Sequence, residues 1–347
     1  MATPEQRPEL EPRRRALLRA IVQEFIDTAQ AVSSRRIAQN YVLGVRPATV
    51  RNMMAGLEQE GYLYQPHTSA GRIPTAKAFR HFVDGLTPCP EVGLRERAQI
   101  EFYYSDHARD PAQLVCDTSG LLSTLTGHTA VATGPCFDLM TLERIELVYL
   151  RRCQVTALLV PAGAGVRDCV LETTRDYTQD DLNRVSNFMT SLIKGCTPEQ
   201  AKIRVSRALQ EQRTRAHSLV HEALQLGADL LVRSEFDAVY VQGSARVLDR
   251  PEFAEPKKAQ ELLDALEDRA ALAKALGQIV DQSNPNVAIG HENTDARLSE
   301  FSVVAAAYAS GPVRLGSLAV IGPLRMDYGR VIALVDYTAR VLSRVWN

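Results

Sequence analysis

The chain has 347 residues, of which 45% are hydrophobic and 23% charged, a composition typical of a globular protein with two or three domains. It has no apolar run near the roughly 20 residues that a membrane-spanning helix needs, and no signal-peptide region at its start, so we expect a cytoplasmic protein without a membrane segment. Six cysteines are scattered without a Cys-x-x-Cys pair. This spacing suits neither a disulfide framework nor a zinc site, and we expect reduced thiols, no metal and no cofactor.

The near-neutral net charge of −1 conceals an uneven distribution. Residues 1–86 contain 12 Lys and Arg against 8 Asp and Glu, whereas the rest of the chain contains 28 against 33. Within 31–80 the count is 7 basic to 2 acidic residues. A basic N-terminal segment on an acidic body is typical of a protein that binds a polyanion such as nucleic acid, although a solvated charged surface gives the same counts.

The first forty residues have a helical pattern after a polar start. Residues 1–12, rich in proline and glutamate, are expected to form a disordered tail. A first helix is expected over 13–28, where apolar residues recur at helical spacing. Ser33 or Ser34 can cap a second helix that ends near Tyr41.

The stretch 45–75 has the outline of a helix followed by a strand, a loop and a second strand. Pro47 fits the first helical position, where its missing N–H costs nothing, and Gly61 would end the helix as a left-handed cap. With the short turn at 42–46, this helix and the one before it make a helix-turn-helix. The strands and loop at 62–74 would then be the wing of a winged helix. The apolar positions expected on the inner face of the helix are Val50, Met54 and Leu57.

The polar side chains of this stretch are candidate contacts to DNA. In a major groove, Arg51 and Asn52 could bond guanine and adenine edges, each with roughly 1–3 kcal/mol of discrimination; contact with phosphate only is the other interpretation. Gly71 would let the loop approach DNA closely, and Arg72 could enter a narrow minor groove. A simple surface turn is the alternative for the loop. The expected DNA-binding residues are Ser34, Arg35, Arg46, Thr49, Arg51, Asn52, His67, Thr68, Ser69, Gly71 and Arg72.

The chain beyond this stretch predicts a mixed body of helices and strands. Thr75 is expected to cap a helix ending near Leu86, and the proline-containing segment 87–90 is the best domain boundary. One long helix is expected over 257–280, and an amphipathic helix over 328–345 ends the chain. Strands are expected at 129–133, 143–149, 155–160, 166–171, 237–242, 287–290, 301–308 and 316–321, and other helices at 114–125, 178–193 and 198–232.

Several blocks of sequence together resemble a known family. The N-terminal ones are RPATVRNMMAGLEQEGYL, then QPHTSAGRIPT, then RHFVDGL. The others are LTGHTAVATGP, which ends at Pro135, and GSLAVIGPLRMDYGRVIALVDYTARVLS, at 316–343. With these blocks at both ends, the chain resembles the HrcA-type heat-inducible transcriptional repressors of bacteria.

The resemblance implies an α+β multidomain protein. Its N-terminal winged helix-turn-helix would span 13–88. A GAF-like α/β sensor domain would comprise 91–174 and 286–347, with a mostly helical dimerisation domain inserted at 175–285. The resemblance further implies a homodimer that binds an inverted-repeat operator in double-stranded DNA upstream of chaperone operons. Heat stress, acting through the chaperonin, would release it.

Other patterns favour ordinary structure over chemistry. His217 and His221 are four residues apart on an expected helix, but no third zinc ligand lies nearby. Gly163 and Gly165 favour a hairpin turn over a phosphate loop. Residues 325–328 suit a small-molecule site, a loop or an inter-domain contact equally. No Ser/His/Asp or Cys/His set has informative spacing, which argues against an enzyme with an accessory DNA-binding domain. The main alternative is a metabolite-sensing regulator that uses its GAF-like domain.

Overall fold

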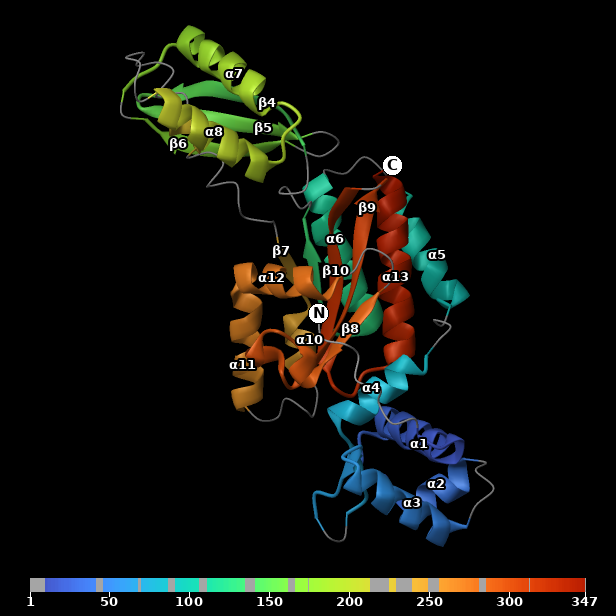
Figure 1. Ribbon diagram of the computed structural model, residues 1–347. Coiled ribbons are helices and arrows are strands. Elements are labelled where there is room, and N and C mark those ends of the chain that lie inside the picture. The colour runs from blue at the N-terminus through green and yellow to red at the C-terminus, as the bar shows by residue number, and fades with distance from the viewer. Residues whose placement is uncertain are drawn as a thin grey trace.

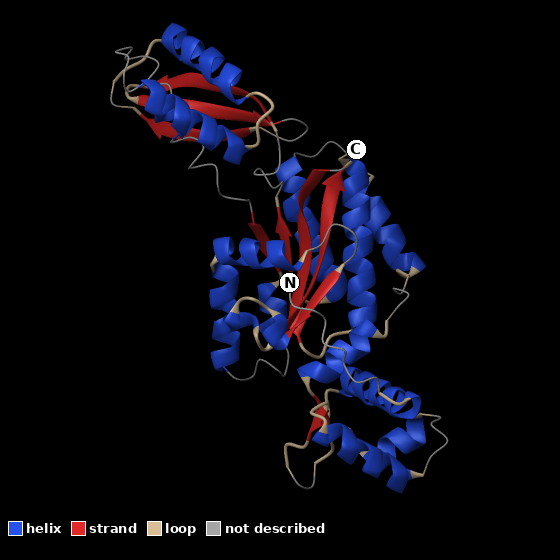
Figure 2. Cartoon of the chain, in the orientation of Figure 1, coloured by secondary structure: helices blue, strands red, loops and turns tan. Residues whose placement is uncertain are grey.

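The computed structural model arranges the chain as three parts in a row (Figure 1). An N-terminal unit, residues 10–86, adjoins a central body, residues 91–134 and 239–346, that is built on a five-stranded sheet. A lobe, residues 141–228, contains a three-stranded sheet. Helices and strands mix along the chain (Figure 2), so this is an α+β protein, as expected. The described residues are 10–41, 46–67, 70–86, 91–105, 111–134, 141–161, 166–173, 175–212, 225–228, 239–248, 256–280, 285–311 and 313–346.

The N-terminal unit is held together by the apolar faces of its helices. Leu17, Ile21 and Ile37 are fully buried and pack in one core with Phe79. Burial of such side chains contributes roughly 1.5–3 kcal/mol each, which explains why short helices are stable here. The elements of the unit are α1 (Pro12–Thr28), α2 (Ser34–Asn40), α3 (Pro47–Gln59), β1 (Leu63–Tyr64), β2 (Ile73–Pro74) and α4 (Ala76–Asp84).

The start of the unit differs from the expected tail over 1–12. Residues 1–9 lie outside the described part of the chain, but Leu10 is buried and Pro12 is the first residue of α1. The carbonyl of Leu10 accepts a hydrogen bond of 3.3 Å from the Arg15 guanidinium. The polar, proline-rich composition of the segment predicts disorder. Composition does not show that Leu10 is buried in the core of the unit.

The central body is organised by an antiparallel sheet with the strand order β7-β3-β10-β9-β8. The strands are β3 (Thr129–Thr133), β7 (Val239–Gln242), β8 (Asn286–Ile289), β9 (Phe301–Ser310) and β10 (Val313–Pro323). The helices are α5 (Leu94–Tyr104), α6 (Pro111–Thr126), α10 (Ser244–Leu248), α11 (Pro256–Glu267), α12 (Arg269–Ile279) and α13 (Tyr328–Val345). The bounds of β3 and α13 are those expected from the sequence.

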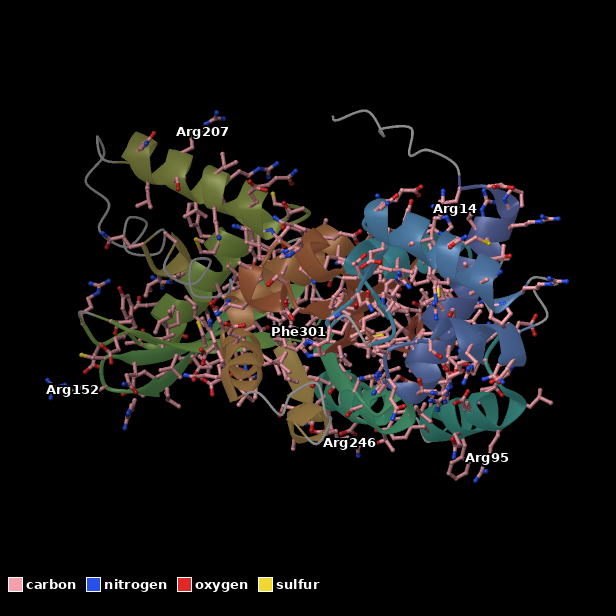
Figure 3. All side chains as sticks on the ribbon, turned by 90° about the horizontal axis from the view of Figure 1, so that it is seen from below. Arg14, Arg95, Arg152, Arg207, Arg246 and Phe301 are labelled. Carbon is pink, nitrogen blue, oxygen red and sulfur yellow. The ribbon has the colours of Figure 1, made fainter. Side chains whose placement is uncertain are left out.

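Both faces of this sheet are buried, as the alternation along β10 shows. Leu318 and Val320 belong to the core formed with α6 and α13, whereas Ala319 and Ile321 belong to the core formed with α11 and α12. Side chains of a strand alternate between the two faces of its sheet, so near-continuous apolar runs are required here. Phe301 lies in the interior, while Arg95, Arg152 and Arg207 lie at the periphery (Figure 3).

The prediction of a single helix over 257–280 is wrong. The helix is interrupted at Asp268, which separates α11 from α12. The Asp268 carboxylate accepts a hydrogen bond of 3.1 Å from the backbone N–H of Ala271 and so caps α12. An aspartate that bonds the backbone in this way competes with continuation of the preceding helix. The apolar spacing hid the break because leucines of both helices, Leu266 and Leu272, enter the same core.

The lobe has its own hydrophobic core and its own sheet. The expected insertion at 175–285 does not follow the sheets, because three strands of the lobe precede it, whereas β7 at 239–242 pairs with β3 of the central body. Alternation along a strand reveals its buried face but not which sheet it joins. The elements of the lobe are β4 (Leu142–Arg151), β5 (Gln154–Pro161), β6 (Arg167–Glu172), α7 (Gln179–Ile193) and α8 (Pro198–Gln212).

Several sequence predictions fall on residues outside the described part. They concern the turn at 42–45, the boundary at 87–90, the glycines Gly163 and Gly165, and the histidines His217 and His221. Within the described ranges, no helix has both the length and the apolar character needed to cross a membrane. Over the same ranges, no three His, Cys, Asp or Glu side chains gather as a metal site.

Candidate nucleic-acid interface

Helix α3 is the central element of the candidate site. Pro47 is its first residue, and Gly61 follows it with φ of +76°, as predicted for a left-handed cap. Val50, Met54 and Leu57 are fully buried, so the opposite side of the helix faces solvent. In Figure 1, α3 lies at the end of the N-terminal unit that is remote from the lobe.

Helix α2 packs beside α3 and begins at a side-chain cap. The hydroxyl of Ser33 accepts a hydrogen bond of 3.3 Å from the backbone N–H of Arg36, so Ser33 rather than Ser34 is the cap residue. Arg36 also forms an ion pair of 2.6 Å with the buried Glu24 of α1. Burial raises the pKa of the nearby Tyr41 to about 12, with a further contribution from Glu24. Arg36 therefore fixes α2 to α1.

Most of the expected DNA-binding side chains are accessible. Those exposed to solvent are Arg35, Arg46, Thr49, Arg51, Asn52 and His67. Three residues, Ser34, Gly71 and Arg72, are half-buried, and Thr68 and Ser69 lie outside the described residues.

The loop that follows β1 folds back onto the start of the unit. Leu63 pairs with Pro74 and Tyr64 with Ile73 in the β1–β2 ladder. Beyond it, the backbones of Val32 and Arg72 exchange two hydrogen bonds of 2.9 Å. The loop is therefore anchored at its base to Val32, two residues before the start of α2, as well as to β1.

Gly71 is required by this anchoring. A Cβ atom at this position would lie 2.6 Å from the carbonyl oxygen of Val32 and 2.7 Å from the carbonyl carbon of Ala31. Such contacts with backbone atoms cannot be relieved by a side-chain rotation. The close approach expected between Gly71 and DNA is thus, in this structure, a close approach to the chain itself.

Arg72 also makes a contact that the sequence did not reveal. Its Nε donates a hydrogen bond of 2.8 Å to Oε2 of Glu58 on α3, and the side chain is only 16% exposed. The guanidinium thereby joins the loop to α3, and the expected insertion of this side chain into a minor groove stays a prediction. The two residues are 14 positions apart, so no local spacing signalled the pair.

The ion pairs of the unit leave a basic outer face. Glu58 is neutralised by Arg72, and Glu60 by Arg14 at 2.7 Å. These two are the acidic residues within 31–80. Among the ion pairs of the described residues, none involves the exposed arginines, which are Arg35, Arg46 and Arg51.

Known proteins match nearly the whole chain. The family described as HrcA protein C terminal domain matches residues 112–332. The heat-inducible transcription repressor HrcA of Geobacter sulfurreducens is 33% identical over 337 residues, covering 97% of this chain and 98% of its own. The protein of that name from Pelotomaculum thermopropionicum is 34% identical, with 97% of each chain covered. A crystal structure of a hypothetical protein, 24% identical, covers 97% of this chain and 99% of its own with a TM-score of 0.64, which shows a shared fold.

The anchoring of the loop predicts a specific effect of Gly71→Ala. The added methyl group forces the loop away from Val32, and we expect a loss of stability of about 1–3 kcal/mol and faster amide hydrogen exchange at Val32 and Arg72. Gly85→Ala is the matched control, since a Cβ there would meet its nearest atom at an ordinary 3.4 Å. Unchanged exchange at Val32 in Gly71→Ala would show that the loop is not held at this point.

Proposed function

The chain belongs to the HrcA family, and on this premise we propose that it is a heat-inducible transcription repressor that binds double-stranded DNA through its N-terminal unit. The observation that carries the DNA-binding site is the exposed face of α3. Three arginines without ion pairs among the described residues surround it, and the two acidic residues of this segment are neutralised within the unit. Phosphate neutralisation by such arginines dominates the affinity of proteins for DNA.

We propose that the unit is a winged helix-turn-helix with α3 as its recognition helix. Its 13 residues are about 20 Å long and fit a major groove about 12 Å wide. Arg51 and Asn52 are both exposed on α3, with Asn52 opposite the buried Val50 and Met54 and Arg51 on the flank beside it, where base edges would lie. The wing is the loop between β1 and β2, with the exposed His67 toward the DNA backbone.

In this proposal Arg72 acts on DNA through the wing. The Arg72–Glu58 pair holds the loop against α3 and removes a negative charge from the groove-facing helix. A negative charge left beside phosphates would oppose binding, and a free loop would lose conformational entropy when it docks. Arg72 therefore contributes both charge balance and order.

We propose that two copies bind an inverted repeat through pairing of their lobes, while the central body is the GAF-like domain. The outer face of the lobe sheet carries two valines on either side of a threonine, with Val148 beside Thr156 and Thr156 beside Val170. Val148 on β4 is 42% exposed and Val170 on β6 is 43% exposed. Leu150, near the end of β4, is also exposed. Contiguous exposed apolar surface of this kind is typical of an interface. A two-fold pair would double the base contacts and fix the half-site spacing.

The role of α3 predicts that Arg51→Ala weakens operator binding by about 1–3 kcal/mol and binding to random DNA much less. Arg72→Ala weakens both, because the wing loses its link to α3. Fluorescence anisotropy with labelled duplexes measures these affinities at a fixed salt concentration. Arg97→Ala, an exposed arginine on α5 of the central body, is the control. An Arg51→Ala protein that binds operator like the unaltered protein would rule out α3 as the reading helix.

The sheet face of the lobe predicts that Val170→Arg dissociates the dimer. A charge buried in an apolar interface loses its hydration and gains no oppositely charged partner there. Sedimentation should therefore show monomers at concentrations where the unaltered protein is a dimer. The control is Ile203→Arg, which places the same charge at a 60%-exposed position on α8 of the same lobe. Dissociation by Ile203→Arg and not by Val170→Arg would show that the interface is on the helical face of the lobe.

We propose that heat stress releases the repressor through loss of its folded state, with the chaperonin as the partner that restores it. Mild heating should then abolish operator binding, and cooling alone should not recover it. Addition of chaperonin and ATP to the cooled protein should restore binding, as gel shift measures. Full recovery on cooling without chaperonin would exclude this mechanism.

A further inference from the structure

Helix α4 connects the N-terminal unit to the central body through an aromatic contact. The ring of Phe79 on α4 lies 6.3 Å from that of Phe25 on α1 and 6.0 Å from that of Tyr328 at the start of α13. The Tyr328 hydroxyl is in turn hydrogen-bonded to Ser302 on β9, at 2.6 Å, and donates to the carbonyl of Leu324. Apolar contacts of this kind bring two surfaces together but leave their relative rotation poorly defined, because they are not directional.

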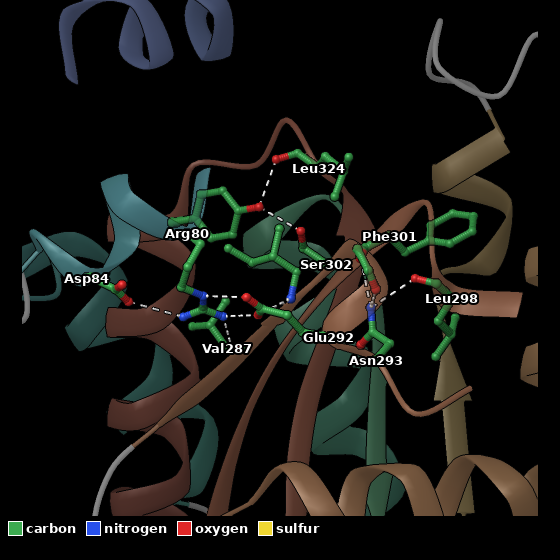
Figure 4. A network of polar contacts seen from close by, with 12 residues as sticks. Arg80, Asp84, Val287, Glu292, Asn293, Leu298, Phe301, Ser302 and Leu324 are labelled. Atoms are coloured by element: carbon green, nitrogen blue, oxygen red, sulfur yellow. Dashed lines mark hydrogen bonds and ion pairs between the residues drawn. The ribbon is translucent and has the colours of Figure 1, made fainter. Parts of the chain in front are cut away.

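Arg80, one residue further along α4, supplies directional contacts (Figure 4). Its Nε donates to Oε1 of Glu292 at 2.9 Å, and one of its terminal nitrogens donates to Oε2 of Glu292 and to the carbonyl of Val287 on β8. The other terminal nitrogen reaches Asp84 at 3.4 Å. The side chain is 16% exposed. A planar guanidinium bound in this bidentate way defines an orientation as well as a distance.

On the body side, hydrogen bonds hold the turn that carries Glu292. Oε2 of Glu292 also accepts a hydrogen bond of 3.0 Å from the backbone N–H of Ile289, so the carboxylate is fixed by its own turn. The side-chain amide of Asn293 donates to the carbonyls of Gly290, Leu298 and Phe301 at 2.9–3.0 Å (Figure 4).

Gly290 allows α4 to approach this turn. Its φ is +60°, and a Cβ there would lie 3.2 Å from the Cβ of Ala76, at the start of α4. A larger residue at this position would be strained in this backbone conformation and would press on the helix. The turn is therefore shaped to receive α4 in one position.

The joint beside α4 also contains a gap in its packing. A cavity of about 510 Å³ lies between Tyr64 and Ile73 of the unit and Phe301 and Leu324 of the central body. Arg325 bonds the carbonyl of Ile26 at 2.8 Å on the α1 side. With a cavity on the β1–β2 side, the Arg80 contacts carry much of the orientation of the unit.

We propose that Arg80, paired with Glu292, is a positioning residue for DNA recognition that fixes the angle of the N-terminal unit on the body and so selects the half-site spacing of the operator. The inference rests on the proposed dimeric reading of an inverted repeat. A small rotation at α4 displaces α3 at the far end of the unit, and two such displacements across a two-fold axis change the distance between the recognition helices. Arg80 itself does not touch DNA.

The test compares Arg80→Gln with Arg80→Lys, Glu292→Gln and the control Arg340→Gln, which removes an exposed i,i+4 pair on α13. Anisotropy is measured on the intact operator, on operators with the spacer changed by one and by about five base pairs, half a helical turn, and on a single half-site. We expect Arg80→Gln to bind the half-site like the unaltered protein but the intact operator about tenfold more weakly, with a smaller difference in affinity between the spacer lengths.

Lysine cannot form the bidentate pair, so Arg80→Lys should have an operator affinity between those of the unaltered protein and Arg80→Gln. Arg340→Gln should change nothing.

Sedimentation and melting temperature show whether each variant is a folded dimer. Glu292→Gln leaves α4 unaltered, and it decides the question if Arg80→Gln does not fold. An unchanged spacing preference in the folded variants would overturn the inference, and so would an equal loss on half-site and intact operator. If the unaltered protein itself has no preference for an inverted repeat over a half-site, the proposed function fails instead.

Discussion

Two acidic side chains lie on an otherwise basic segment, and their neutralisation is the condition on which the candidate interface depends. Glu58 and Glu60 lie at the C-terminal end of α3, and Arg72 and Arg14 contact them at 2.8 and 2.7 Å. Left unpaired, either carboxylate would repel phosphate across the short distances of a groove. Because the partners come from the loop and from α1, the same contacts that balance the charge also assemble the unit. Electrostatics and folding are therefore coupled at this site.

The local features of the site were predictable from the sequence, and the long-range ones were not. Pro47, the apolar spacing of α3 and Gly61 depend on residues close together in the chain, and the structure has them as predicted. The Arg72–Glu58 and Arg80–Glu292 pairs join residues 14 and 212 positions apart, and nothing in either sequence neighbourhood identifies its partner. The sequence predicts that Gly71 lets the loop approach DNA closely, whereas its close neighbour in the structure is the backbone of Ala31 and Val32.

In the fold as well, the positions of elements along the chain were largely predictable, and their partners in the sheets were not. Most of the expected strands and helices lie close to their predicted positions, since burial on one or both faces leaves a periodic pattern in the sequence. The helix expected over 198–232 is described only over 198–212 and 225–228. The sheet to which a strand belongs leaves no such pattern, so 142–172 could not be assigned to the lobe, nor 239–242 to the central body. The break at Asp268 was missed for a related reason. One carboxylate that caps α12 outweighs a leucine spacing that continues across it.

The distribution of hydrophobic cores gives the proposed release mechanism a structural route. The N-terminal unit shares one continuous core with α5, α6, α13 and one face of the central sheet, through Phe79 and Tyr328, whereas the lobe has a separate core. Packing disturbed by heat in the body would therefore reach α4 directly, whereas among the described residues the lobe has a core of its own. Strand β8, which carries the Val287 carbonyl bound by Arg80, is an edge strand paired only with β9. An edge strand has ladder hydrogen bonds on one side, so this contact of the N-terminal unit lies at the margin of the central sheet. In the proposed dimer, such an arrangement would let the N-terminal unit lose its orientation while the lobes stay paired.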